Sequence, residues 1–349
     1  MTSLFVPGRL CLFGEHSDWA GRYRSEDPSL APGFCLVAGT DQGLRAEVEP
    51  RAASFEIESE LPDGTRLGPF RAPATPEALG AATREGGFFA YAAGTAAELL
   101  TRGAPGGVAL RVRSDLPVRK GLSSSAATCV LVARAFDRSY GLGLGERGEI
   151  EAAFAGERRT GSECGRMDQI CAYGRRASFL RFDGEGLEVE ILAPAAPLHL
   201  LVVDLRRGKD TRRILRELNA CFPSAPGPVA AAVREALGPR NAEVLARARG
   251  ALLAGDAARL GALMEEAQAL FDAQVAPACQ ELRAPRLHEV LAHPAVRELA
   301  HGGKGVGSGG DGSAQLVVRG PAERDVLAKR LEMELGVSCL PLTLEVATR

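Results

Sequence analysis

Short apolar runs predict strands along the first half of the chain. The longest covers residues 4–13, and a regular alternation of apolar and other side chains falls at 108–113. Gly, Pro and Asp separate the runs, as is typical of turns. Helical spacing of apolar residues predicts helices over 88–102 and 126–140, and Gly141 is a typical residue just past a helix end. Further strands are predicted at 34–38, 44–49 and 54–58.

The second half of the chain combines strand patterns at both ends with a long helical region between them. Residues 210–300 have mostly helical spacing, and the stripe that begins at Leu260 predicts a helix with one face in the core. Prolines interrupt the strand patterns at 193–197. A helix is predicted between the last two strands. The strands predicted in this half cover 177–182, 187–192, 198–205, 314–318 and 340–346.

These elements predict an α+β fold with mixed and antiparallel sheets and helices in each half. The chain has 349 residues, which exceeds the size at which a single hydrophobic core stops growing, so two domains are expected. The proline-containing connection at 193–197 sets the predicted boundary. We therefore predict an N-terminal domain of residues 1–195 and a C-terminal domain of residues 196–349.

The composition and the net charge of the chain argue against some classes of binding partner. The net charge is −2 and the basic residues are scattered, which predicts binding to neither nucleic acid nor an anionic membrane. We find no signal peptide and no apolar run long enough to span a bilayer, so a cytoplasmic monomer or homodimer acting on a small molecule is expected. The eight cysteines form no C-x-x-C pair and predict reduced, mostly buried thiols. The five histidines lack zinc-site spacing, so any metal is expected to arrive with a nucleotide.

The segment 117–127 leads a glycine and three consecutive serines into a predicted helix. The start of a helix exposes unpaired backbone N–H groups and the positive end of the helix dipole, so it is suited to bind phosphate. Gly121 lets the backbone come close to a ligand, and the serines can donate hydrogen bonds or bind magnesium. An ordinary serine N-cap is the alternative explanation.

A second segment, 7–19, runs from an apolar strand into clustered polar side chains. Glu15, His16 and Asp18 offer donors and acceptors suited to a polyol, and Arg9 supplies a fixed positive charge for a reacting phosphate. The alternative is a solvated turn after the strand, with His16 merely packed.

A third segment, 301–312, holds seven glycines in twelve residues ahead of a predicted strand. It suits close approach of the backbone to a ligand, and a flexible linker is the competing explanation. Neither the strand-to-helix G-x-G-x-x-G context of a dinucleotide fold nor a G-x-x-x-x-G-K-[ST] loop occurs in the sequence.

Together the three segments resemble the GHMP family of small-molecule kinases, and the resemblance spans most of the chain. The family motif P-x-x-x-G-L-x-S-S-A is matched at 117–126, and the glycine-rich third motif at 305–310. Within the family the sequence is most similar to galactokinases, whose P-G-R-x-x-x-x-G-E-H-x-D and C-G-x-M-D-Q signatures are matched at 7–18 and 164–169. The resemblance implies a two-domain kinase fold with the active site in the cleft between the domains.

The resemblance also implies roles for individual residues. Asp168 is the general base that takes a proton from a sugar hydroxyl, and Arg9 stabilises the developing charge and helps to keep Asp168 ionised. Glu15, His16 and Asp18 bind the sugar, and ATP and Mg²⁺ are the implied cofactors. Ser124 and Glu157 are the implied metal ligands. ATP and its phosphates are bound by Lys120, Gly121, Leu122, Ser123, Ser124, Ser125, Ala126, Gly307 and Gly309.

Each of these roles has an alternative. Asp168 is also suited to cap a short helix at 169–173, and Glu157 to pair with Arg158 or Arg159 outside any site. Glu163 also lies near the expected position of the metal-binding glutamate.

The resemblance predicts phosphorylation of a monosaccharide hydroxyl, the anomeric C1 hydroxyl, by direct in-line transfer from ATP. The alternatives are a mevalonate kinase-like enzyme acting on a hydroxy acid, and a sensor that binds ATP and sugar without catalysis. Trp19 stands where a tyrosine is usual in galactokinases, the segment 22–33 is longer and more charged, and Arg119 and Lys120 replace small residues. These departures leave the sugar open, and Lys209 or Arg206 is suited to bind a carboxylate such as that of a uronic acid.

Overall fold

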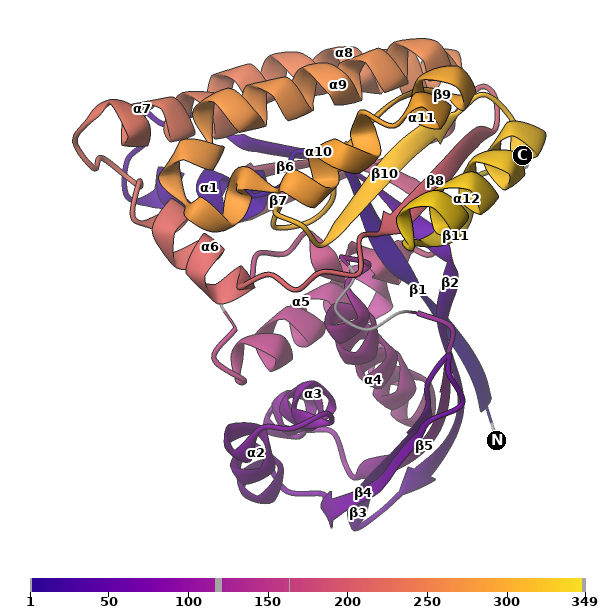
Figure 1. Cartoon of the computed structure of the whole chain (residues 1–349). Coiled ribbons are helices and arrows are strands. Elements are labelled where there is room, and N and C mark those ends of the chain that lie inside the picture. The colour runs from indigo at the N-terminus through magenta and orange to yellow at the C-terminus, as the bar shows by residue number, and fades with distance from the viewer. Residues whose placement is uncertain (1, 117–120, 163, 347–349) are drawn as a thin grey trace. The chain divides into compact units, whose positions relative to one another are not determined.

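The computed structural model describes residues 2–116, 121–162 and 164–346. Contacts divide the chain into two compact units (Figure 1). Unit 1 consists of Met1–Arg9 and Gly39–Arg175, and unit 2 consists of Leu10–Ala38 and Arg176–Arg349. Both units are discontinuous in sequence, because the first two strands of the chain each contribute residues to both. The division into domains of residues 1–195 and 196–349 remains a prediction from the sequence.

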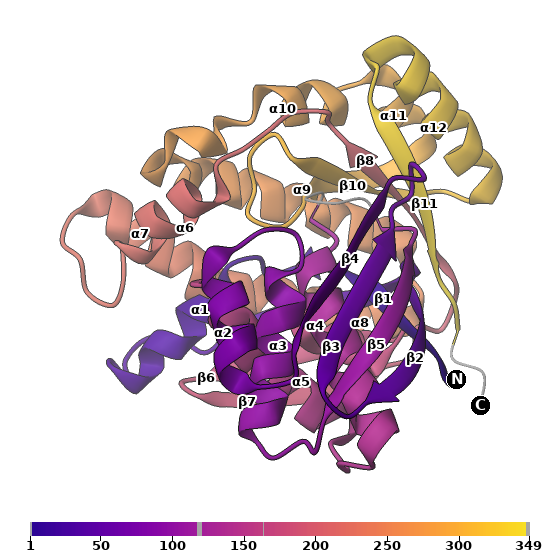
Figure 2. The same ribbon diagram turned by 90° about the horizontal axis from the view of Figure 1, so that it is seen from below.

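Unit 1 contains a sheet that combines parallel and antiparallel pairs of strands (Figure 2). The strand order is β4-β3-β5-β2, and β1 pairs with β2. β3 and β5 are parallel, whereas β3 with β4 and β2 with β5 are antiparallel. Val48 of β2 lies opposite Leu110 of β5, and both side chains are buried. The strands are β1 (Thr2–Phe13), β2 (Gly33–Arg51), β3 (Ser54–Glu60), β4 (Arg66–Pro73) and β5 (Gly107–Ser114).

The helices of unit 1 pack against one another, and α4 lies at their centre. α4 is buried over most of its length, as its nearly continuous apolar run from Cys129 to Ala133 requires. It ends at Gly141, whose φ of 63° is left-handed and whose N–H donates to Asp137 O, so the predicted helix end is confirmed. The helices are α2 (Pro76–Glu85), α3 (Ala90–Thr101), α4 (Ser124–Tyr140), α5 (Gly145–Arg158) and the 3₁₀ turn η2 (Asp168–Tyr173).

Unit 2 contains a four-stranded antiparallel sheet in the order β11-β8-β10-β9. A second group of antiparallel strands consists of residues 33–38 of β2 with the hairpin of β6 and β7. The strands of unit 2 that follow β2 are β6 (Ala177–Asp183), β7 (Gly186–Leu192), β8 (Leu198–Asp204), β9 (Ala300–Gly305), β10 (Ser313–Val318) and β11 (Ser338–Leu344).

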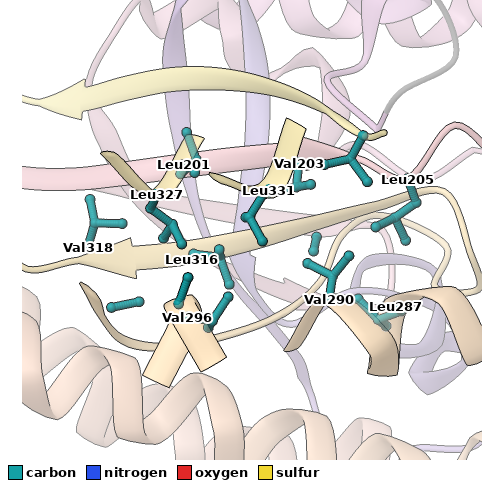
Figure 3. Close-up of a cluster of buried hydrophobic side chains, with 14 of the residues drawn as sticks. Leu201, Val203, Leu205, Leu287, Val290, Val296, Leu316, Val318, Leu327 and Leu331 are labelled. Atoms are coloured by element: carbon teal, nitrogen blue, oxygen red, sulfur yellow. The ribbon is translucent and has the colours of Figure 1, made fainter. Parts of the chain in front are cut away.

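One core of unit 2 lies where β8 and β10 meet the helices α11 and α12 (Figure 3). Leu201 and Leu316 from the strands and Leu331 from α12 are almost completely buried there. Figure 1 shows α8 and α9 side by side, and α9 also packs on β9. The helices are α1 (Ser17–Arg22), α6 (Thr211–Asn219), α7 (Pro228–Glu235), α8 (Asn241–Ala254), α9 (Ala257–Gln274), α10 (Pro285–Leu291), α11 (Pro294–Leu299) and α12 (Pro321–Leu335).

The structure confirms the predicted α+β class and corrects several of its elements. β2 is one strand of 19 residues where the sequence predicted two, at 34–38 and 44–49. Two glycines and an aspartate at 39–43 resemble a turn, but pairing with neighbouring strands overrides that local preference. Helices α2 and α5 and strand β4 were not predicted. In the part of the chain that the structure describes, no helix is long and apolar enough to cross a membrane.

Candidate active site

Arg9 and Asp168 form an ion pair inside unit 1. Arg9 lies on β1 and is 3% exposed, and its Nη2 donates to Oδ1 of Asp168, the first residue of η2. The Asp168 side chain does not cap η2, so the alternative explanation for this residue does not apply. Nε and Nη1 of Arg9 are buried and bond to none of the described residues. Buried donors are almost always paired in native proteins, so these two indicate a place for a ligand oxygen.

The predicted phosphate loop lies against Arg9. The Arg9 backbone N–H donates to Leu122 O at 3.1 Å. The strand can approach this closely because Gly8 has no side chain, since a Cβ there would lie 2.9 Å from Leu122 O. Gly121 has a left-handed φ of 77°. Lys120, like Pro117 to Arg119 before it, lies outside the described residues.

Helix α4 starts without the side-chain cap that the sequence offered as an alternative. Ser123 occupies the N-cap position with a φ of 54°, and its hydroxyl makes no capping bond. The first turn carries no acidic side chain in this 17-residue helix. Its N-terminal dipole therefore faces no acidic side chain from the helix itself. Leu122 and Ala126 are buried beneath Ser123, Ser124 and Ser125, which are partly exposed.

Glu157 is turned inward from the end of α5. It is 3% exposed, and Ser125 Oγ donates to its Oε1 at 3.0 Å while Gln169 Nε2 donates to its Oε2 at 2.7 Å. Burial raises the pKa of Glu157, and these two hydrogen bonds and the charge of Arg9 oppose the rise. Arg159 pairs with Glu98 instead, so the predicted alternative of a Glu157–Arg159 pair is wrong.

The oxygen donors around Glu157 fit a hard cation such as Mg²⁺. A carboxylate and a hydroxyl are the ligand types that Mg²⁺ prefers, and it usually takes further oxygens from water and phosphate. The hydroxyl that contacts Glu157 is that of Ser125, whereas the sequence assigned Ser124. Among the described residues, no group of three or more His, Cys, Asp or Glu side chains forms a metal site, so phosphate and water would have to complete the coordination.

Gln169 is a residue of this site that the sequence analysis missed. It is completely buried, it holds Glu157, and its Oε1 has no partner among the described residues. Its place directly after Asp168 in the C-G-x-M-D-Q segment was the available signal.

In unit 2, Glu15 lies just beyond the end of β1 and is held by a lysine. Lys304 Nζ, from β9, donates to Glu15 Oε1 and to Gly305 O, the latter at 2.9 Å. The Glu15 side chain is 10% exposed and the Lys304 side chain is 7% exposed. The sequence analysis did not single out Lys304, because one lysine in a glycine-rich segment carries no spacing signal.

His16 is committed to contacts with the protein. Trp19 Nε1–H donates to His16 Nδ1 at 3.1 Å, which leaves the ring proton on Nε2, 3.2 Å from Ser308 O. Burial lowers the pKa of His16 to about 4, helped by the charges of Lys209 and Lys304 and opposed by the bond to Ser308. The ring is therefore neutral and has no free nitrogen. This geometry matches the predicted alternative of a packed histidine. Asp18, in the first turn of α1, is also buried.

The third glycine-rich segment is an ordered strand and loop, so the linker alternative is wrong. Gly302 lies in β9, where a Cβ would lie 2.3 Å from Gly261 O of α9, and the glycine thus permits close packing of strand and helix. Gly307 and Gly309 lie in the loop after β9 and have left-handed φ angles of 68° and 78°. Lys209 Nζ donates to Gly309 O at 2.7 Å, and burial lowers the pKa of Lys209 to about 8 against the attraction of Glu15.

Comparison with known proteins shows which proteins this chain resembles. Residues 90–175 match the family described as GHMP kinases N terminal domain. A galactokinase from Thermococcus kodakarensis is 27% identical, with 98% of this chain and 96% of that protein covered. Mevalonate kinase from L. major, solved with R-mevalonate, has a TM-score of 0.74 at 19% identity and covers 100% of this chain and 97% of its own. Lactococcus lactis galactokinase complexed with galactose has a TM-score of 0.74 at 17% identity, with coverages of 99% and 93%.

The fold and the family match first define the class of protein, which is that of ATP-dependent small-molecule kinases. Over residues 90–175 the chain is similar to the N-terminal domain of GHMP kinases, and over nearly its whole length it is similar to a galactokinase.

Proposed function

We propose that the chain transfers the γ-phosphoryl group of ATP to the anomeric hydroxyl of a monosaccharide. The observation that carries this proposal is the Arg9–Asp168 pair, in which a partly exposed carboxylate is joined to a buried guanidinium with two unused donors. A base and a fixed cation side by side are what attack on a phosphoryl group needs. The homology to a galactokinase supports a sugar as the acceptor.

Asp168 is the proposed general base. Its carboxylate is 27% exposed, so a hydroxyl can reach it, and it accepts the proton as the sugar oxygen attacks phosphorus. Arg9 lies beside it, and the free Nε and Nη1 donors are suited to the phosphoryl oxygens. The bond to ADP breaks as the bond to the sugar oxygen forms, and no phosphoenzyme is involved.

The loop 121–126 and the start of α4 are proposed to hold the phosphates of ATP. Their backbone N–H groups and the helix dipole are suited to bind anions, because no side chain caps the start of the helix. Ser125 and Glu157 are the proposed protein ligands of Mg²⁺, which would neutralise phosphate charge. The backbone of Gly307 and Gly309 is also proposed to contact ATP.

Glu15 and Asp18 are the proposed contacts to the sugar, and His16 positions them without touching it. The His16 ring fixes the loop after β9 through Ser308 and the turn of α1 through Trp19.

The test is a panel of acceptors with Mg-ATP. Free hexoses, hexosamines, uronic acids and mevalonate are compared by ADP release, and the product is examined by ³¹P NMR. We expect turnover with a monosaccharide and a phosphorus signal coupled to the anomeric proton. Turnover with mevalonate alone would support the hydroxy-acid alternative. Raised thermal stability with ATP and sugar, but no ADP from any acceptor, would support the sensor alternative.

A further inference from the structure

Unit 2 contains a cavity directly behind Glu15. Its volume is about 50 Å³, and its lining comes from the end of β1, from α8 and α9, from α10 and from the loop after β9. Glu15, Lys304 and the backbone of the glycine loop form one part of the lining. The remaining lining is mostly apolar and includes Phe13, Leu237, Val244, Phe271, Leu282 and Leu287.

The polar side chains in this lining are already engaged with the protein. Gln268 accepts from the Gly305 N–H at 2.7 Å and donates to Asp272 at 2.8 Å. Asn241 Nδ2 donates to Ser17 Oγ and to Phe34 O. Lys304 donates to Glu15 and to Gly305 O. A polar group that entered the cavity would lose water and gain few new bonds, which is unfavourable, whereas an apolar group loses nothing there.

The size of the cavity limits what can fill it. A single water needs about 10–15 Å³ of such volume, so the cavity holds about three to five non-hydrogen atoms. A whole sugar ring is too large. A methyl group, or the methyl end of an acetamido group, is of the right size, and filling an apolar void recovers packing that the empty protein lacks.

We propose that this cavity receives an apolar, methyl-bearing substituent of the acceptor, so that the preferred substrates are deoxy or N-acyl monosaccharides. The inference rests on the proposed function and deepens it. The cavity shares Glu15 and the glycine loop with the residues assigned to substrate and phosphate, so its occupant adjoins the acceptor. The sugar ring would lie at the polar edge of the cavity, where the Glu15 carboxylate is bonded to Lys304.

The test uses pairs of sugars that differ only in this substituent. D-galactose is compared with its 6-deoxy form, and galactosamine and glucosamine are compared with their N-acetyl forms. At least one methyl-bearing member is expected to have a kcat/KM at least about tenfold higher than its partner, the usual effect of a filled apolar pocket. Equal kcat/KM values within every pair would overturn the inference while leaving the sugar kinase intact, and absence of turnover with all sugars would overturn both.

A substitution that fills the cavity gives a second, independent readout. Ala267 lines the cavity from α9, and Ala262 lies exposed on the same helix, so Ala267→Leu and Ala262→Leu are matched variants of equal helix propensity. Ala267→Leu is expected to raise KM for the methyl-bearing sugar at least about tenfold with kcat unchanged, because it removes a uniform binding contact. Ala262→Leu is expected to leave both constants within twofold. If Ala267→Leu raises KM equally for both members of a sugar pair, the inference is contradicted. If Ala267→Leu does not fold, the comparison of the sugar pairs with the wild-type enzyme decides the matter.

Discussion

The polar residues singled out in unit 1 and those singled out in unit 2 differ in what they leave free. In unit 1 the buried Arg9 side chain keeps two donors without a protein partner, and helix α4 starts with no side-chain cap. In unit 2 both ring nitrogens of His16 are used by the protein, and Glu15 is bonded by Lys304. A motif residue thus acts either by touching the ligand or by positioning a neighbour, and the hydrogen-bond inventory distinguishes the two roles.

The comparison predicts its largest effect at Arg9. Arg9→Met removes the charge and the unused donors, and we expect kcat/KM to fall about 10³-fold or more, the scale on which lost transition-state donors act. Arg9→Lys restores the charge without the planar fork and should recover only part of the loss. Steady-state kinetics test this prediction. Arg66→Met is the control, because Arg66 is an exposed arginine in the same unit. Arg9→Met with nearly wild-type kcat/KM would show that the unused donors serve no reaction.

An intermediate effect is expected at Gln169, which bonds to Glu157 rather than to a ligand. Gln169→Leu removes a hydrogen bond that opposes the burial-raised pKa of Glu157, so the carboxylate should become a poorer metal ligand. The Mg²⁺ concentration for half-maximal rate should rise about 10- to 100-fold, with the rate at saturating Mg²⁺ largely retained. Gln280→Leu, at an exposed position, is the control. An unchanged Mg²⁺ titration would remove Glu157 from the proposed metal site.

The smallest effect on activity is expected at His16, where glutamine can replace both hydrogen bonds. His16→Gln should change kcat/KM less than about tenfold, because the ring has no free nitrogen to offer a sugar. A loss of about 10³-fold that is confined to the sugar KM would show direct contact and break the comparison.

His16 also predicts a dependence of stability on pH. Its pKa is about 4 in the folded protein, against 6.5 for an ordinary histidine, so between these pH values the unfolded chain binds the extra proton. Folding stability from this group is complete above pH 6.5 and is lost as pH falls toward 4, by up to about 3 kcal/mol. Thermal unfolding between pH 4 and 7 should show a shallower fall for His16→Gln than for wild type. Parallel curves would contradict the assignment.

The sequence was most informative where pattern and chemistry coincide. The apolar run 4–13, the helix 126–140 and the α+β class are confirmed, because strand alternation and helical spacing survive folding. The proximity of Arg9 and Asp168, 159 positions apart, came from the resemblance and could not have come from periodicity. Gln169 and Lys304 were missed because their roles exist only through long-range partners, Glu157 and Glu15. β9 was missed because glycine lacks strand propensity, and here it serves close packing against α9.

The central claim is that Asp168 is the base in phosphoryl transfer to a sugar, and Asp168→Asn tests it most directly. Asparagine keeps the size and the contact with Arg9 but cannot accept the proton. With the preferred acceptor, saturating Mg-ATP and Asp63→Asn as a surface control, the account predicts a kcat for ADP release about 10²- to 10⁴-fold below wild type with thermal stability retained. A kcat within a fewfold of wild type would contradict it.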